Sequence, residues 1–306
     1  MKVSSKKSRR LAAAIAVGAL GCFLHTLESI YGPAPVDGPS SVHHGSPRPL
    51  VVALGDSLTH GVVSHPWLAD LASRFKRVKF LNTARCAHTS HAVLGTARSL
   101  TLHKPPDLVL ILVGTNDAIS ALSPMSRKFY VDRGHLPADA PTALRGTLAA
   151  YERNLGALVT HARRALRAKK VVVISPPPFG NGRSARALPT GSIWGDLVVQ
   201  PNVAARLVAR RAALVARRRG AVYVDLHAAL SRQLAREPLR EAEYFNASAW
   251  QLGRQILRAP LVRFVPGLTF NRLSSTPYLH DHLHLNGRGA QLLVDALAPL
   301  VARLAS

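Results

Sequence analysis

The sequence is poor in cysteine and in acidic residues. Its 306 residues include only two cysteines, Cys22 and Cys86, which is too few for a disulfide framework. They do not have the C-x-x-C spacing that is typical of a structural zinc site. Asp and Glu together number 16 against 40 Lys and Arg, so the formal net charge is +24. A disulfide-stapled domain and a cysteine-ligated zinc domain are therefore excluded.

The excess of positive charge favours anionic partners such as nucleic acid, a phospholipid surface or an acidic substrate. The arginines are spread over several segments rather than gathered in one tail, which favours a solvated basic surface. Aromatic residues do not alternate with them as they do in proteins that bind single-stranded nucleic acid. We therefore expect no nucleic-acid partner, and an anionic membrane surface stays an open alternative. The sequence does not indicate an oligomeric state.

Residues 1–27 have the pattern of a targeting segment. A basic stretch precedes an apolar run from Leu11 to Leu24, as in a secretory signal. The run is shorter than the about 20 residues that a membrane-spanning helix needs. Small residues allow cleavage before Cys22, whereas the apolar residues beyond it allow an uncleaved anchor. We expect a secreted or membrane-anchored protein, with a mitochondrial presequence as the alternative, because no acid precedes Glu28.

A linker rich in proline and glycine follows at residues 28–48, and a single domain is expected over residues 49–306. Within it, short apolar runs alternate with longer stretches that have helical periodicity. The expected strands are Leu50–Leu54, Val78–Leu81, Leu108–Val113, Val171–Ile174 and Val222–Val224. The expected helices are Pro66–Phe75, 142–168, Val203–Arg218 and Gln291–Leu304. This alternation predicts an α/β fold in three layers, α/β/α, around a doubly wound, five-stranded parallel sheet.

Two long segments interrupt the alternation, at residues 118–141 and 231–279. Connections of this length in a compact domain are usually functional or disordered. The second segment contains Tyr244, Phe245 and Trp250, so we expect it to be structured. Both are interpreted as insertions that shape substrate choice.

Polar residues with complementary chemistry follow the expected strands. Ester hydrolysis requires a nucleophile, a base, a group that orients the base, and donors for the oxyanion. Ser57 follows the first strand and can be the nucleophile, His284 can take its proton, and Asp281 can hold the imidazole tautomer. The backbone N–H of Ser57, the side-chain amide of Asn116 and a backbone N–H of the turn at residues 84–88 can stabilise the oxyanion.

Four sequence blocks carry a resemblance to a known family. Gly-Asp-Ser-Leu at 55–58, the turn at Asn82, Gly-Thr-Asn-Asp at 114–117 and Asp-x-x-His at 281–284 occur in the order found in the SGNH, or GDSL, hydrolase superfamily. The resemblance covers about residues 49–304. Three prolines at 176–178 are similar to the isoamyl acetate-hydrolysing esterase branch.

The resemblance implies a flavodoxin-like SGNH hydrolase fold and hydrolysis of esters or thioesters without a metal or other cofactor. It implies Ser57, Asp281 and His284 as the catalytic triad, and Ser57, Ala87 and Asn116 as the oxyanion hole. The sequence departs from the family where glycine is usual, at Ala84 and Ala87. A backbone donor survives that change, but the turn is expected to be more strained.

Competing patterns are weaker. His280, His282 and His284 alternate and could bind a metal from one strand face. Gly180-x-Gly182-x-x-Ala185 mimics a dinucleotide fingerprint, but three prolines separate it from the preceding strand, so it is rejected. The tripeptide starting at Asn246 is a glycosylation sequon.

We therefore predict a serine esterase acting on a short-chain ester, a lysophospholipid or an acyl thioester through an acyl-Ser57 intermediate. The alternatives are an acetylesterase acting on acetylated sugars, or a basic nucleic-acid- or membrane-binding module with a vestigial hydrolase fold. The presence of nucleophile, base and orienting acid disfavours the second of these.

Overall fold

A computed structural model describes residues 48–183, 195–237, 262, 267–274 and 276–305. The segment expected to target the protein, most of the expected linker, the sequon at Asn246, Ala185 of the rejected fingerprint and much of the 231–279 segment lie outside the described residues. In the part of the chain that is described, no helix is both long enough and apolar enough to cross a bilayer.

Five parallel strands form one sheet in the order β2-β1-β3-β4-β5. They are β1 (Leu50–Gly55), β2 (Lys79–Asn82), β3 (Leu108–Leu112), β4 (Lys170–Ile174) and β5 (Val222–Val224). The inner strands β1 and β3 are apolar along their whole length and fully buried, as expected for parallel strands covered on both faces. The predicted doubly wound, five-stranded parallel sheet is confirmed.

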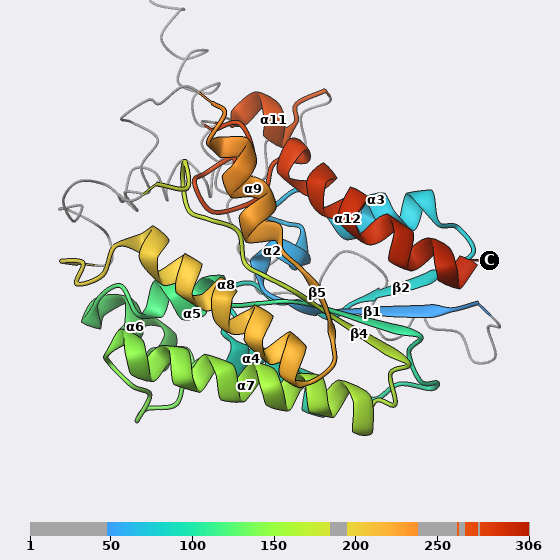
Figure 1. Cartoon of the computed structure of the whole chain (residues 1–306), viewed down its shortest axis with the longest axis horizontal. Coiled ribbons are helices and arrows are strands. Elements are labelled where there is room, and N and C mark those ends of the chain that lie inside the picture. Colours follow the sequence, from blue (N-terminus) through green and yellow to red (C-terminus); the bar gives the residue numbers. More distant parts are fainter. Residues whose placement is uncertain (1–47, 184–194, 238–261, 263–266, 275, 306) are drawn as a thin grey trace, which may run out of the picture.

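Helices cover both faces of this sheet (Figure 1). One layer contains α4 (Ser90–Ser99), α5 (Thr115–Ser120), α6 (Pro124–Asp132), α7 (Leu144–Arg164) and α8 (Pro201–Arg218). The other contains α3 (Trp67–Arg74), α9 (Leu226–Leu234) and α12 (Gly287–Ala305), with the short α11 (Phe270–Leu273) beside it. The three-layer α/β/α arrangement follows from these positions.

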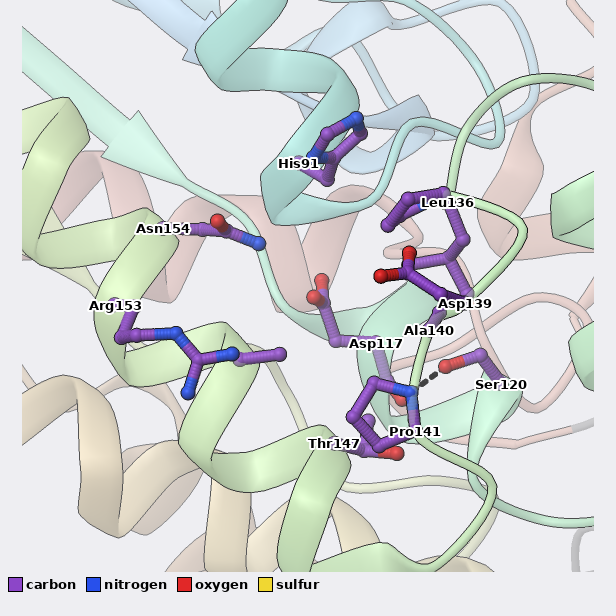
Figure 2. A pocket seen from close by; sticks show the side chains of 12 residues that line it. His91, Asp117, Ser120, Leu136, Asp139, Ala140, Pro141, Thr147, Arg153 and Asn154 are labelled. Carbon is purple, nitrogen blue, oxygen red and sulfur yellow. Dashed lines mark hydrogen bonds between the residues drawn. The ribbon is translucent and has the colours of Figure 1, made fainter.

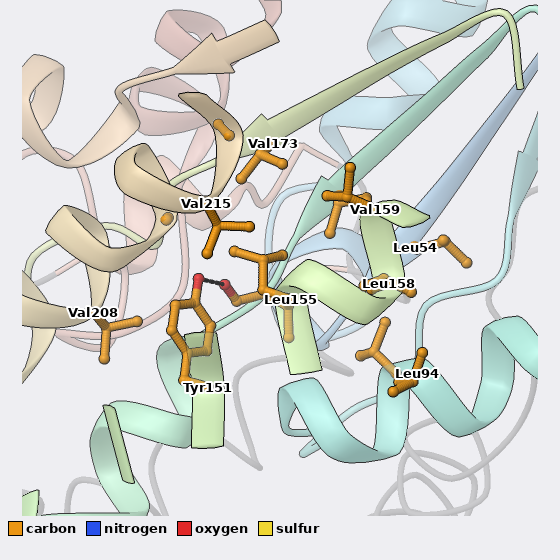
Figure 3. Close-up of a cluster of buried hydrophobic side chains, with 14 of the residues drawn as sticks. Leu54, Leu94, Tyr151, Leu155, Leu158, Val159, Val173, Val208 and Val215 are labelled. Carbon is orange, nitrogen blue, oxygen red and sulfur yellow. Dashed lines mark hydrogen bonds between the residues drawn. The ribbon is translucent and has the colours of Figure 1, made fainter. Parts of the chain in front are cut away.

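Each helical layer forms its own hydrophobic core with the sheet. Alternate side chains of β1 point to opposite faces, so Val52 and Leu54 join the α4–α7–α8 core whereas Val51 and Ala53 join the α3–α9–α12 core. Figure 3 shows the first core, in which Leu155 and Val215 bring α7 and α8 together over the sheet. These packed layers make the sheet a rigid base for the loops at its edge.

Most expected elements occur with boundaries shifted by a few residues. The 142–168 helix is shorter, as α7, and the closing helix starts earlier, at Gly287. Sequence reasoning missed α4 and α9. The first has a weak apolar face and an internal glycine, and the second follows β5 directly at an Asp225 cap, so no loop marks its start. The 118–141 segment begins in α5 and contains α6, and α9 extends into the 231–279 segment.

Candidate active site

The carboxyl ends of the central strands lie side by side. Gly55 at the end of β1 is opposite Leu112 of β3, and Leu112 is opposite Ile174 of β4. Residues that follow these strands therefore reach the same edge of the sheet, which is where open α/β sheets bind their ligands.

The strand-to-helix turn after β1 fixes the position of Ser57. Asp56 caps the four-residue helix α2 (Ser57–His60), and its Oδ1 accepts a hydrogen bond of 3.0 Å from the Leu58 N–H. Gly55 is required by close packing, since a Cβ there would lie 2.5 Å from the Leu112 carbonyl oxygen and 2.6 Å from Thr59 Oγ1. The turn presents the Ser57 hydroxyl at the edge of the sheet while the residue stays 7% exposed.

Ser57, His284 and Asp281 are brought together across the chain. Ser57 Oγ lies 2.8 Å from His284 Nε2, and His284 Nδ1 lies 2.5 Å from Asp281 Oδ2. The second carboxylate oxygen, Oδ1, accepts from the backbone N–H groups of Leu283 at 2.9 Å and His284 at 2.6 Å. The loop thus holds the carboxylate with its own backbone, and the carboxylate holds the imidazole.

The charges of this loop are set by mutual contact. Burial alone would raise the pKa of Asp281, but the adjacent His280 and His284 and the hydrogen bonds from His284 outweigh it and hold the pKa well below its usual range. Burial alone would lower the pKa of His284, but the Asp281 carboxylate outweighs it and raises the pKa. The result is a carboxylate that stays ionised beside an imidazole that readily accepts a proton.

The predicted oxyanion donors surround the same turn. As the first residue of α2, Ser57 has a backbone N–H with no intrahelical acceptor. Asn116, in α5 just beyond β3, is 4% exposed and donates from Nδ2 to the His88 carbonyl at 2.9 Å. Since an amide nitrogen carries two hydrogens, one remains for a substrate oxygen.

Asn82 stabilises the turn that contains Ala87 through two side-chain hydrogen bonds. Its Nδ2 donates to the Thr59 carbonyl at 2.9 Å and its Oδ1 accepts from the Ala84 N–H at 3.1 Å. The Arg85 N–H donates to the Gly55 carbonyl at 3.2 Å. Ala87 itself has φ 60°, a left-handed conformation that favours glycine, as expected from the family's usual residue there. The alanine therefore stores strain in the turn.

Two further carboxyl groups, those of Asp56 and Asp117, belong to the same sequence motifs, although the motifs alone assign them no role. Burial raises the pKa of Asp56 to about 7, and its Oδ2 has no hydrogen-bond partner among the described residues. Burial raises the pKa of Asp117 to about 6, although its two oxygens accept from Ser90 N–H and Ser90 Oγ. Their place directly beside Ser57 and Asn116 in the motifs was the signal that could have identified them.

The histidine-rich loop does not bring its three histidines together as metal ligands. Among the residues that the structure describes, the close group is His280, Asp281 and His284, without His282. Asp281 and His284 already bond each other, and His284 bonds Ser57. His280 Nε2 bonds the Val63 carbonyl at 2.5 Å. Each of these three side chains thus has at least one hydrogen-bond partner within the protein.

A separate hollow of about 210 Å³ lies behind this edge of the sheet (Figure 2). It opens between the 118–141 segment and α7, with Asp117 at its base and Arg153 and Asn154 on one side. Ser57, His284 and Asn116 do not line it. The hollow is therefore separate from the Ser57–His284 pair, and its nearest link to the predicted site is Asp117, the residue after Asn116.

Comparison with known proteins gives one family and one fold. Residues 53–292 match the model of the GDSL-like lipase/acylhydrolase family. No curated protein matches the chain.

Many solved structures are similar to this chain, and two of them serve as examples. An alpha/beta hydrolase enzyme from the metagenome of Lake Arreo, Spain, is 18% identical with a TM-score of 0.50, covering 85% of this chain and 98% of that one. An acetylxylan esterase from Geobacillus stearothermophilus, solved as a catalytic mutant, is 15% identical with a TM-score of 0.51, covering 86% and 95%. At these identities the likeness concerns the fold.

Proposed function

Since the chain belongs to the GDSL-like lipase/acylhydrolase family, whose members hydrolyse ester bonds, we propose that it cleaves carboxylic esters or thioesters through an acyl-enzyme on Ser57. His284 removes the proton from Ser57 Oγ as the oxygen attacks the acyl carbon, and it then delivers that proton to the leaving alcohol or thiol. Water, deprotonated by His284, next attacks the acyl-Ser57. His284 returns this proton to Ser57 Oγ as the bond to the acyl carbon breaks and the acid leaves. The N–H groups of Ser57 and Ala87 and the Asn116 amide stabilise both tetrahedral intermediates.

One observation carries this proposal: the continuous hydrogen-bond chain from Ser57 Oγ through His284 to Asp281, with links of 2.8 Å and 2.5 Å. The Asp281 carboxylate accepts from Nδ1, so the proton of the neutral imidazole sits there and Nε2 is left to receive the proton of Ser57. That arrangement has the polarity needed for a general base, and it argues against a vestigial site.

The test is activity-based labelling with a fluorophosphonate probe, together with hydrolysis of p-nitrophenyl esters. Ser57→Ala should abolish labelling and lower kcat by up to about six orders of magnitude. Ser120→Ala is the matched control, because it removes the hydroxyl of a similarly buried serine that bonds the Asp117 carbonyl instead. Labelling that persists in Ser57→Ala would place the nucleophile elsewhere.

The substrate candidates are short-chain esters, lysophospholipids and acyl thioesters, with acetylated sugars as a second candidate. The second is favoured by the similar fold of the Geobacillus acetylxylan esterase. A series of acyl chain lengths on one leaving group, a lysophospholipid and acetylated xylan should be compared at equal enzyme concentration. The highest kcat/KM identifies the class, and a preference for acetyl on any alcohol would favour the sugar substrate.

We also propose an anionic membrane surface as partner, reached through the outer face of α7 and α8. Glu152 is the one acid in these two helices, and it pairs with Arg211 and Arg218. The remaining arginines are exposed: Arg145, Arg153, Arg163, Arg164, Arg206, Arg210 and Arg217. Binding to anionic vesicles should then weaken steeply with salt, because exposed charges are screened beyond about 8 Å at physiological ionic strength.

Replacing Arg206, Arg210 and Arg217 by glutamine should reduce vesicle binding while ester hydrolysis of a soluble substrate stays unchanged. Absence of binding to anionic vesicles at low salt would leave the charge as a solubility feature. A secretory leader at residues 1–27 would be consistent with a membrane surface as the partner. N-terminal sequencing of the mature protein would test whether this leader exists.

A further inference from the structure

The 118–141 segment packs against the oxyanion side of the site. A reciprocal capping box between Ser123 and Ser126 starts α6 and fixes its direction. At the other end of α6, the Tyr130 carbonyl accepts from the His135 N–H at 2.9 Å and the Leu136 N–H at 3.2 Å. The turn at the end of α6 therefore places the side chains of Tyr130 and His135 in the same part of the molecule.

Tyr130 orients the amide of Asn116. Its hydroxyl donates to Asn116 Oδ1 at 2.8 Å, while Asn116 Nδ2 donates to the His88 carbonyl at 2.9 Å. A carbonyl can only accept, so the nitrogen must face His88 and the oxygen must face Tyr130. Tyr130 is 2% exposed, and burial raises its pKa well above the usual value, so the hydroxyl remains a donor at every working pH. The amide is thereby held with its second N–H free to meet a substrate oxygen.

His135 supports the turn that carries Ala87. Its Nδ1 lies 2.9 Å from the Ala87 carbonyl oxygen, and because that oxygen only accepts, Nδ1 carries the proton. The Thr89 hydroxyl in turn bonds the His135 carbonyl, and the His88 and His135 rings meet edge to face at 4.8 Å. Ala87 has a positive φ, and a strained residue persists only where its surroundings hold it. His135 provides such a hold.

We infer that Tyr130 and His135 are positioning residues of ester hydrolysis: they hold Asn116 and the Ala87 turn so that the oxyanion donors stand in place before the substrate arrives. This inference rests on the proposed function. Preorganised donors cost no rearrangement at the moment of reaction, so their support affects the transition state more than the bound substrate. The 118–141 segment is then part of the catalytic scaffold, in addition to any role in substrate choice.

Tyr130→Phe tests the first contact, with p-nitrophenyl acetate as the substrate. We expect kcat to fall by about tenfold with little change in KM, since removing a whole oxyanion donor costs about 10² to 10³ and here a donor is only misoriented. Binding of a trifluoromethyl ketone, whose adduct mimics the oxyanion, should weaken by the same factor. Tyr151→Phe is the matched control, because Tyr151 is as deeply buried and donates to the Val113 carbonyl at 3.1 Å.

A double-mutant cycle separates positioning from general destabilisation. If Tyr130 acts through Asn116, Tyr130→Phe should cause no further loss of kcat in an Asn116→Ala background. Both tyrosine variants are expected to lower the melting temperature similarly, because each loses one buried hydrogen bond. Equal kcat losses in Tyr130→Phe and Tyr151→Phe, or an undiminished loss in the Asn116→Ala background, would overturn the inference.

His135 is tested by rescue. His135→Ala should lower kcat several-fold, and His135→Asn should recover most of it, because an asparagine amide can donate from the place of Nδ1. His161→Ala is the matched control: His161 is also half-buried and bonds a backbone carbonyl, that of Ala97, at 3.0 Å. Equal activity in His135→Ala and wild type would overturn the role of this residue.

Different results would overturn the inference and the proposed function. If wild type is labelled by fluorophosphonate and hydrolyses esters, while neither Tyr130→Phe nor His135→Ala alters kcat, the inference is wrong and the proposed function stands. If wild type neither labels nor hydrolyses any ester, the proposed function is wrong and the inference falls with it.

Discussion

Ser57 lies between two regions in which the pKa of a buried carboxyl group is shifted in opposite directions. On one side is the loop at residues 280–284, where Asp281 is 4% exposed and its pKa is held well below the usual range. On the other is the sheet edge, where Asp56 is fully buried and its pKa is raised to about 7. Burial is nearly the same for the two carboxyl groups. It therefore does not decide which of them carries charge at neutral pH.

The difference lies in their hydrogen-bond partners and neighbouring charges. Asp281 accepts from two backbone N–H groups and from His284, and it lies beside a second histidine. Asp56 accepts from the Leu58 N–H, and the nearby Asp117 carboxyl opposes its ionisation. Two buried carboxyl groups with opposite environments are the usual sign of distinct roles in one site. The loop supplies fixed negative charge to the imidazole, whereas Asp56 at the sheet edge is only partly ionised near neutral pH.

Removing the fixed charge of the loop should have the largest effect. In Asp281→Asn the amide Nδ2 would face His284 Nδ1 and favour the wrong imidazole tautomer, so we expect kcat to fall by about 10⁴. Ester hydrolysis and the rate of fluorophosphonate labelling measure this loss. Asp295→Asn, at an exposed position on α12, is the control for loss of a carboxylate. An Asp281→Asn enzyme within tenfold of wild type would mean that another group sets the tautomer.

Removing a donor from the opposite side should cost less. Asn116→Ala deletes the side-chain donor while the two backbone donors remain, and we expect kcat to fall by about 10² to 10³ with KM little changed. Asn202→Ala is the control, since Asn202 is also buried but anchors only the backbone around Phe179 and Arg183. A kcat equal to that of wild type would show that Asn116 does not contact the oxyanion.

Neutralising Asp56 should sharpen the contrast between the two regions. His284 must be neutral to accept a proton, so activity rises with pH through its pKa, which Asp281 and, to a smaller extent, Asp56 raise. Asp56→Asn removes one of these charges, so the rise should complete at lower pH. Asp139→Asn, an exposed carboxylate, should leave the profile in place. A profile that does not move in Asp56→Asn would mean that Asp56 is neutral over the whole range.

The same variant has a stability signature. The pKa of Asp56 is higher in the folded protein than the ordinary 3.8, so the folded state binds more protons between that value and about 7. Wild-type stability is therefore lost as pH rises through this window, and Asp56→Asn should not share that loss. The melting temperature of Asp56→Asn minus that of wild type should therefore increase from pH 4 to pH 7.

The sequence predicted the sheet and the pairing of Asp281 with His284, but it did not predict the contacts of Tyr130 and His135. Continuous apolar runs identify buried parallel strands, and Asp281 and His284 are three residues apart, so a local pattern reveals their pairing. The contacts of Tyr130 with Asn116 and of His135 with Ala87 join residues 14 and 48 apart. No spacing rule indicates such contacts, because they depend on where α6 packs. The charge state of Asp56 likewise depends on burial by distant elements.

The smallest effect is expected for Ala87→Gly, because the backbone N–H is retained and only the backbone strain at this residue changes. Ala87→Gly keeps the backbone N–H and relaxes the positive φ, so kcat/KM should stay within about twofold of wild type while the free energy of unfolding rises by about 1 kcal/mol. Proline cannot serve as the donor deletion here. Its ring fixes φ near −65°, against 60° in the structure, so the turn itself would break.

Ala87→Gly also tests how strongly the turn is held from outside. With His135 in place, the added freedom of glycine should not loosen the donor, and activity should not fall. In a His135→Ala background the same freedom is unrestrained, so Ala87→Gly should then lower kcat further. A loss of kcat for Ala87→Gly in the otherwise intact protein would mean that the alanine side chain, and not the contact with His135, keeps the N–H in place. Urea unfolding and ester hydrolysis of wild type, the two single variants and the double variant together distinguish the two outcomes.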